Sequence, residues 1–561
     1  MTEDKMSNTV GRWSTLGWFR SGEPMIWLTA ASVALCVLAV LGLLALLAVR
    51  GLGHFWASDV MQIQINNNIR TEMVLGQVAE NVTVPRQQLI DAGITPKSNA
   101  QLFDRTLLKR GNRENFDSDF VWILDEQIES ITRPEDILVI ERLEWGNFYG
   151  TLVDVRDESS ITPHTPESGD FAWQLLGDYI DEVRMLREEI KYIERLEMGK
   201  VNKKLDSLRL AIRQSEPDNY SDLARSKAEL EEDYQRLQSQ LVILRQKQGA
   251  YLFSVKQIDG STKVLPVSKV VRIYRPNSMS YIQKMNLYME KLWEFLSEQP
   301  REANTEGGVF PAIFGTVMMV ILMSIIVTPF GVVAAVYMRE YATQGSVTRV
   351  IRIAVNNLAG VPSIVYGVFG LGFFVYGVGG EIDKLFFAET LPSPTFGTPG
   401  LMWASLTLAL LTLPVVIVAT EEGLARIPKS IREGSLALGA TRFETLVRVV
   451  LPMASPAMMT GLILAVARAA GEVAPLMLVG VVKLAPNLPV DGTYPYIHLD
   501  QKFMHLGFHI YDVGFQSPNV EAARPLVYAT ALLLVFIITI LNLLAIYLRN
   551  RLREKYKLLE A

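Results

Sequence analysis

Two oppositely charged residues, Arg468 and Glu472, stand inside the apolar stretch ILAVARAAGEVAPLMLVG. A charge near the centre of a membrane span costs about 2.5–3.5 kcal/mol, so such residues tend to face a bundle interior or an aqueous path. Their four-residue spacing predicts that both lie on one helix face. The guanidinium of Arg468 suits bidentate contact with an oxyanion such as phosphate, while Glu472 could orient Arg468 or accept a hydrogen bond from a protonated anion. The alternative is that the two charges neutralise one another and only hold the helices together.

A second candidate site is the polar segment 433–452, EGSLALGATRFETLVRVVLP, between two apolar stretches. Glu433 is followed six residues later by Gly439 and, after nine more, by Val449-x-Leu451-Pro452. This spacing resembles the cytoplasmic docking loop of ABC importer permeases, although Gly434-Ser435 replaces two alanines and lowers the helix propensity locally. The resemblance implies contact with a separate ATPase subunit through Glu433, Gly434, Ser435, Ala437, Leu438, Gly439, Ala440, Thr441, Leu451 and Pro452.

Membrane helices must position both sites. The chain has 561 residues, 49% of them hydrophobic and clustered in runs, which is typical of a membrane protein with a soluble insert. Six runs offer about 20 or more apolar residues, enough to cross a hydrocarbon layer of ~30 Å. The predicted spans are Met25–Val49, Phe310–Met338, Ile353–Gly380, Leu401–Thr420, Ala457–Val482 and Pro525–Leu548.

The distribution of Lys and Arg predicts the orientation of these spans. Sixteen of these residues lie in the two tails and in the segments on the same side, against four in the short loops on the other side. By the positive-inside rule, both termini of this multi-pass protein are cytoplasmic. The resemblance to ABC importer permeases implies that the membrane is a bacterial inner membrane. The predicted organisation is a cytoplasmic tail 1–24, a first span 25–49, an extracytoplasmic domain 50–305, a five-span core 306–548 with the docking loop 421–452, and a cytoplasmic tail 549–561.

The extracytoplasmic domain is predicted to be α+β. Short apolar runs in its first part indicate strands, whereas apolar residues recur at helical and heptad spacing over about 171–248. This pattern predicts an antiparallel coiled-coil hairpin that packs on itself or also contacts a partner. Asp259-Gly260 then predicts a β-hairpin between Tyr251–Ile258 and Lys263–Tyr274, and an amphipathic helix is expected from about Ser280 to Leu296.

Several functions are disfavoured by the composition. The chain lacks G-x-x-x-x-G-K-[ST], the loop that cradles the phosphates of ATP, so ATP hydrolysis is expected in a separate subunit. His498, His505 and His509 cluster without an adjoining Cys or carboxylate pattern, so we expect no metal site. Neither a bound cofactor nor a basic surface for nucleic acid is predicted, and the single cysteine, Cys36, excludes an intrachain disulfide.

Four segments in order make the resemblance more specific: Gly307–Ala342, Asn356–Gly370, the docking loop, and ARAAGEVAPL at Ala467–Leu476. Together they resemble the PstA family of phosphate ABC transporter permeases over roughly residues 305–561. The resemblance implies the α-helical fold of a type I importer permease with six spans, in which Arg468 and Glu472 are critical for transport. It also implies a second, PstC-like permease, a PstB-like ATPase dimer that uses ATP and Mg, and a PstS-like periplasmic protein that delivers phosphate.

The sequence also allows other interpretations of the substrate and of the function. The substrate could be another oxyanion, such as sulfate, molybdate or a phosphonate, because the docking loop does not discriminate among them. A different class of function is a membrane sensor or scaffold coupled to phosphate signalling. The family resemblance does not extend to most of the extracytoplasmic domain, for which we expect a noncatalytic role in docking the binding protein or stabilising the assembly.

Overall fold

The computed structural model describes residues 23–66, 71–94, 96, 98–116, 119–157, 170–214, 220–388, 391–485, 487–492, 496–517 and 520–557. Most of the predicted N-terminal tail and the last four residues therefore lie outside the described residues. Six helical segments in the described part are long and apolar enough to cross a membrane. They are Met25–Phe55, Phe310–Tyr341, Ser363–Phe386, Leu401–Ala425, Arg442–Gly471 and Ala523–Glu554.

The helical core consists of α8 (Phe310–Val336), η9 (Tyr337–Tyr341), α9 (Ser346–Leu358), α10 (Ser363–Phe369), η10 (Gly370–Gly379), α11 (Gly380–Phe386), α12 (Leu401–Ala425), α13 (Lys429–Ala437), α14 (Arg442–Thr445), η12 (Leu446–Val450), α15 (Leu451–Gly471), α16 (Leu476–Val479), α17 (Leu506–Tyr511), η13 (Asp512–Gln516) and α18 (Val520–Lys557). Helix α12 is central and packs against α8 and α15. Its Leu408 and Leu411 are buried beside Met319 and Met323 of α8. Burial of such side chains holds the core together where helices meet one another rather than lipid.

All six spans differ from their predicted bounds, and two of them begin ten or more residues away from the predicted start. The third was expected over Ile353–Gly380, but α9 is a separate helix and the span begins at Ser363. Pro362 explains this break, because a proline disfavours helical geometry in the residue before it. The fifth was expected over Ala457–Val482, but it runs from Arg442 to Gly471. The second half of the polar segment is thus continuous with the membrane helix through η12.

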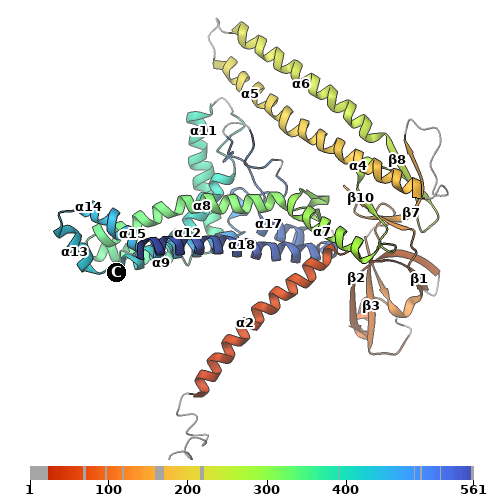
Figure 1. Ribbon diagram of the computed structural model, residues 1–561, viewed down its shortest axis with the longest axis horizontal. Coiled ribbons are helices and arrows are strands. Elements are labelled where there is room, and N and C mark those ends of the chain that lie inside the picture. Colours follow the sequence, from red (N-terminus) through yellow and green to blue (C-terminus); the bar gives the residue numbers. More distant parts are fainter. Residues whose placement is uncertain are drawn as a thin grey trace, which may run out of the picture.

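Helix α2 (Glu23–Leu52) diverges from the other membrane helices and meets them only near its C-terminal end (Figure 1). There it packs against α18. Gly51 allows the close approach, because a Cβ atom at this position would lie 2.6 Å from the backbone nitrogen of Ala529. Most of the remaining surface of α2 is exposed in the isolated chain. Next along the chain comes η2 (Gly53–Phe55), where the inserted domain begins.

The inserted domain, between η2 and α8, contains two five-stranded antiparallel sheets with the orders β4-β3-β2-β1-β5 and β10-β6-β7-β8-β9. The strands are β1 (Val60–Asn66), β2 (Thr71–Pro85), β3 (Leu102–Lys109), β4 (Phe120–Leu124), β5 (Ile128–Thr132), β6 (Ile137–Arg142), β7 (Phe148–Asp157), β8 (Tyr251–Lys256), β9 (Thr262–Pro266) and β10 (Val270–Tyr274). Short connecting elements are α3 (Arg86–Asp91), η3 (Asp125–Gln127) and η7 (Val267–Lys269). The predicted β-hairpin is β8–β9. Its second arm ends earlier than expected, since β10 pairs with β6 instead.

A long helical arm rises from the second sheet (Figure 1). It consists of α4 (Asp170–Tyr192), the π-helical turn η5 (Ile193–Glu197), α5 (Met198–Gln214) and α6 (Tyr220–Gly249). The base of α4 packs on the sheet through Ala172, Leu176 and Val183. Farther along, Ile190 and Ile193 pack against Leu237, Leu241 and Leu244 of α6. The arm is inserted between β7 and β8, whose ends pair at Asp157 and Tyr251.

Helix α7 (Tyr281–Ser297) connects the inserted domain to the core. Ser280 caps it, with its hydroxyl accepting from the backbone nitrogen of Gln283. The chain then passes through β11 (Pro300–Arg301), η8 (Glu302–Asn304) and β12 (Glu306–Gly307) into α8. A network of ion pairs fastens α7 to the second sheet, because Arg272 contacts Glu141 at 3.0 Å and both Glu290 and Glu294 at 2.9 and 3.0 Å.

Candidate functional site

Arg468 and Glu472 do not share a helix as the sequence predicted. Arg468 lies in the last turn of α15, which ends at Gly471, and Glu472 has extended backbone angles (φ −78°, ψ 130°). The sequence carries a signal for this end, since Gly471 and Pro475 are residues that commonly follow or terminate a helix. The prediction that Glu472 lies on the same continuous helix as Arg468 is therefore wrong.

The two side chains nevertheless come together. Arg468 Nε lies 3.5 Å from Glu472 Oε1, and the side chains are 35% and 21% exposed. Among the described residues, no other hydrogen bond or ion pair engages the guanidinium of Arg468. The carboxylate thus holds one edge of a partly exposed guanidinium and leaves its other N–H groups available, an arrangement that can bind an anion with planar or tetrahedral oxygens.

The docking segment forms a helix–turn–helix at the end of the core away from the inserted domain (Figure 1). Helix α13 runs through Gly434 and Ser435, and the Ser435 hydroxyl lies 2.9 Å from that of Thr445 in α14. Gly439 follows with φ +89°, a left-handed conformation that glycine adopts without steric cost. Thr441 then caps α14, and its hydroxyl accepts from the backbone nitrogen of Glu444.

The turn between α13 and α14 presents an unusual surface. Leu438 is 91% exposed, and Leu436, Phe443 and Val447 are also exposed large apolar side chains. Glu433, Gly434, Ala437, Gly439 and Thr441 are exposed beside them, whereas Ser435, Ala440, Leu451 and Pro452 are half-buried. Apolar side chains gathered with polar neighbours on a surface loop are typical of a contact site for another protein.

The docking helix is fastened to the core by Arg432. Its Nη2 donates to Glu340 Oε1 in η9 at 2.9 Å and to the carbonyl oxygen of Leu424 in α12 at 2.8 Å. Its Nη1 donates to the carbonyl oxygen of Ile427 at 3.2 Å. Arg432 thus links α13 to η9 and to the end of α12 through charge-assisted hydrogen bonds.

The three clustered histidines have separate surroundings. His498 Nε2 lies 2.9 Å from Asp491 Oδ1 and 3.2 Å from Lys203 Nζ on α5, while Lys203 donates to Asp491 Oδ2 at 3.1 Å. Burial lowers the pKa of His505 and of His509 to about 4, so both are neutral at pH 7. The described residues hold no group of three or more His, Cys, Asp or Glu side chains arranged to share a metal ion.

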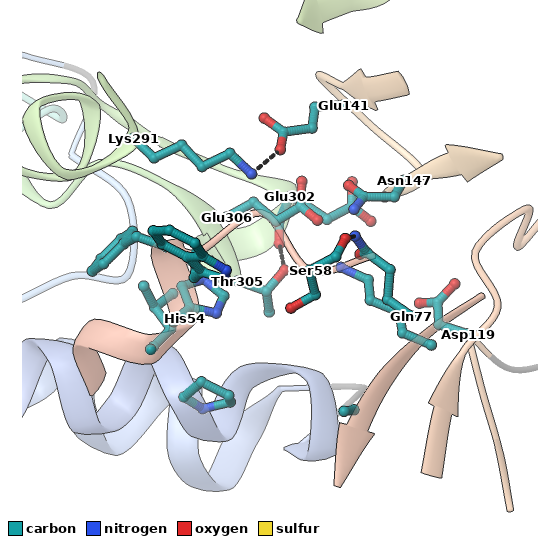
Figure 2. A pocket seen from close by; sticks show the side chains of 18 of the residues that line it. His54, Ser58, Gln77, Asp119, Glu141, Asn147, Lys291, Glu302, Thr305 and Glu306 are labelled. Carbon is teal, nitrogen blue, oxygen red and sulfur yellow. Dashed lines mark hydrogen bonds and ion pairs between the residues drawn. The ribbon is translucent and has the colours of Figure 1, made fainter. Parts of the chain in front are cut away.

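A cavity of about 460 Å³ lies at the junction of α2, the inserted domain and the core. Figure 2 shows Glu306, Asn147, Ser58 and Gln77 around it and Lys291 directed at Glu141. Burial alone would raise the pKa of Glu141, but Lys291 and Arg272 outweigh burial and hold this pKa at about 2. Sequence reasoning missed the cavity, because its lining residues come from distant parts of the chain and share no motif.

The helical core and α2 together supply, within the described residues, six helices long and apolar enough to cross a membrane, which defines a polytopic membrane protein. A family model described as "Binding-protein-dependent transport system inner membrane component" matches residues 327–554. "Probable ABC transporter permease protein YqgI" of Bacillus subtilis is 30% identical over 271 residues, which cover 47% of this chain and 85% of that relative. The chain belongs to this family of inner membrane transport components.

Further relatives match over a shorter part of their length. "Probable ABC transporter permease protein YqgH" of Bacillus subtilis is 35% identical over 35% of this chain and 62% of that protein. "Phosphate transport system permease protein PstA 1" of Mycobacterium tuberculosis is 39% identical over 31% of this chain and 52% of that protein. The chain thus spans between half and two thirds of the length of these two relatives. A solved inward-facing MetNI methionine ABC transporter aligns at 18% identity with a TM-score of 0.32, over 49% of this chain and 99% of that chain.

Proposed function

We propose that this chain is a permease subunit of an ATP-driven ABC importer that carries inorganic phosphate across a bacterial inner membrane. The observation that carries the proposal is the partly exposed guanidinium of Arg468, paired with Glu472 at the end of a membrane helix. The similarity to proteins named as phosphate transport system permeases supports phosphate as the anion. The chain itself performs no chemical reaction in this proposal.

Arg468 binds phosphate in transit through the N–H groups that Glu472 does not engage. Glu472 orients the guanidinium and competes with the anion for it, which prevents the path from holding phosphate too tightly. The carboxylate also accepts a hydrogen bond from monoprotonated or diprotonated phosphate. Fully ionised sulfate has no proton to donate, so it would leave two like charges facing each other without a hydrogen bond.

Energy for transport comes from a separate ATPase dimer that docks on the surface around Leu438. Binding of ATP draws the two ATPase copies together and displaces α13, and Arg432 passes this displacement to α12 and η9. A second permease subunit completes the path. A soluble phosphate-binding protein delivers the substrate on the opposite side of the membrane, where the inserted domain helps to receive it or stabilises the assembly.

The test is labelled phosphate uptake in permease-deficient cells that contain this chain and its partner subunits. We expect Arg468→Ala to reduce uptake by about tenfold or more, because a charge-assisted hydrogen bond to the anion is lost. Arg468→Lys should retain part of the uptake, and Glu472→Gln should weaken the preference for phosphate over sulfate. Arg184→Ala, on the exposed face of the arm, is the matched control at equal membrane abundance.

Each failure of this experiment has a distinct meaning. Uptake that survives Arg468→Ala would make the charged pair a structural bridge and would refute its role in the path. Uptake competed by sulfate, molybdate or a phosphonate rather than by phosphate would assign another oxyanion. A complete assembly that moves no anion but still alters phosphate-dependent signalling would favour a sensor.

A further inference from the structure

The junction cavity lies at the ends of two helices that are long and apolar enough to cross a membrane. Val49 and Arg50 near the end of α2 form part of its wall, and Pro525 and Leu526 in the first turns of α18 form another part. The inserted domain closes the opposite side with residues that include Lys109 and Glu306. A volume of about 460 Å³ is within the usual size of small-molecule sites. The cavity is thus bordered by the ends of two candidate membrane spans on one side and by polar residues of the inserted domain on the other.

Most charges around the cavity are paired with one another. Lys291 Nζ lies 2.5 Å from Glu141 Oε1, Arg113 Nη1 lies 3.4 Å from Glu302 Oε1, and Arg301 pairs with Glu294. These pairs bind α7, η8 and the sheets together, so they have a structural explanation. They leave little charge free to recognise a ligand.

Three lining charges have no ion pair among the described residues: Arg50 at the exposed rim, and Lys109 and Glu306 inside. Burial would lower the pKa of Lys109, but Tyr149, Glu306 and Asp119 raise it above its usual value, so the ammonium stays charged. Burial raises the pKa of Glu306. An incoming cation would favour the ionised form of this carboxyl group. These three groups, which form no ion pair within 4 Å among the described residues, offer two cations and one carboxylate to a ligand.

We propose that the junction cavity binds a phosphoethanolamine group, with Lys109 and Arg50 on its phosphate and Glu306 on its primary ammonium. The position at the membrane boundary assigns this group to the headgroup of phosphatidylethanolamine, whose acyl chains would lie along the exposed surface of α2. Phosphatidylglycerol has no cation for Glu306. The quaternary ammonium of phosphatidylcholine donates no hydrogen bond and is larger.

The experiment uses the full chain, purified in detergent and depleted of lipid, and measures bound lipid by native mass spectrometry. Phosphatidylethanolamine, phosphatidylglycerol and phosphatidylcholine with identical acyl chains are added at equal concentration. We expect phosphatidylethanolamine to bind about tenfold more tightly than either, which corresponds to one charge-assisted hydrogen bond. Glu306→Gln should remove this preference, because Glu306 contacts the ammonium. Lys109→Gln should instead weaken binding of all three lipids, whereas Lys109→Arg should retain most of the binding.

Two exposed residues of the arm provide matched controls, since Lys200→Gln and Glu189→Gln make the same chemical changes away from the cavity. Thermal unfolding of each variant shows whether the fold is retained. Soluble O-phosphoethanolamine, added to the wild type, separates the two sources of the group. Displacement of the lipid by this compound supports recognition of the group itself, and binding of the lipid alone supports recognition of the headgroup in its membrane setting.

Equal binding of phosphatidylethanolamine and phosphatidylglycerol to the wild type would overturn the proposal. So would displacement of the lipid by inorganic phosphate as readily as by O-phosphoethanolamine, because the ammonium would then play no part. If the Gln variants fail to fold, the wild-type protein alone still tests the proposal. Its preference among the three lipids, and the displacement of bound lipid by O-phosphoethanolamine or by inorganic phosphate, then show whether the ammonium is recognised. None of these results depends on which anion the protein transports.

Discussion

At the scale of single residues, the inserted domain relies on largely buried charges, each of which is stabilised by oppositely charged neighbours. Glu141 accepts from Arg272 Nη1 at 3.0 Å and from the hydroxyl of Tyr274 at 3.2 Å, and it also pairs with Lys291. A buried ion pair contributes little by itself, but removing one partner leaves a charge without compensation. A single substitution in this network should therefore loosen α7 from the second sheet. Because α7 leads into α8, the start of α8 should be affected as well.

Glu141→Gln should destabilise the inserted domain by about 3 kcal/mol, because Lys291 and Arg272 lose their shared carboxylate. For a domain of this size the midpoint of thermal unfolding should fall by about 6–12 °C. The folded-state pKa of about 2 is below the ordinary 4.5, so the carboxylate stabilises the protein above pH 4.5 and this stability is lost as the pH falls toward 2. The difference between wild type and variant should shrink over the same range.

The exposed Glu189→Gln change provides the control for this prediction and should leave the midpoint nearly unchanged. Differential scanning fluorimetry in detergent across the pH range measures both effects. A midpoint for Glu141→Gln equal to that of wild type at neutral pH would show that the pairs around Glu141 contribute no net stability.

At the scale of elements, the docking turn depends on one backbone conformation. A residue with a side chain at Gly439 would be strained at φ +89°, although no atom stands within 4 Å of the added Cβ. The turn sets the orientation of α13 relative to α14, and with it the positions of the exposed Leu438 and Phe443 on the docking surface. Strain in this turn should therefore alter docking before it alters the membrane core.

Gly439→Ala should reduce co-purification of the ATPase subunit several-fold, since the left-handed conformation costs a residue with a side chain about 1–2 kcal/mol. Gly439→Asn is the matched variant, because asparagine tolerates this conformation better and should retain more of the ATPase. Unchanged co-purification of the ATPase in Gly439→Ala would show that the turn does not set the docking geometry.

The helical arm is held over the core by Lys203, Asp491 and His498. Lys203→Gln should release this contact and raise hydrogen exchange in α5 and around Asp491 about two- to fivefold, as expected for a partly exposed ion pair worth about 0.5–1 kcal/mol. Lys200→Gln, on the same helix, should have no such effect. Equal exchange in both variants would mean that the arm rests on the core through other contacts.

At the scale of the whole molecule, a permease core and a large inserted domain meet at α7 and at the arm contact. Replacing residues 198–236 by a short Gly-Ser linker would remove Lys203 but keep the packing of Ile190 and Ile193 against Leu237, Leu241 and Leu244. We expect normal membrane insertion and ATPase binding, with several-fold lower uptake at limiting phosphate. Normal uptake would show that the outer part of the arm does not receive the binding protein.

The sequence predicted some features well because they depend on local physics. Apolar length is sufficient to locate six spans, and Ser280 and Asp259-Gly260 are local signals for a helix start and a turn. The end of α15 was mispredicted because the apolar run continues past Gly471, although Pro475 contradicts a continuous helix. The order of the strands and the cavity were beyond prediction, since both depend on residues far apart in the chain, such as Arg50, Lys109 and Glu306.

The pairing of Asp157 with Tyr251 means that the arm interrupts what would otherwise be a simple β-hairpin. An insertion at such a point can change length by whole heptads, roughly 10 Å each, without altering the register of the sheet or the membrane helices. Heptads added between Ile193 and Lys203 would move the contact with Asp491, whereas heptads added beyond Lys203 would only extend the tip. The length of the arm, and with it the distance that its tip reaches, can therefore change without a change in the fold of the sheet or of the membrane core.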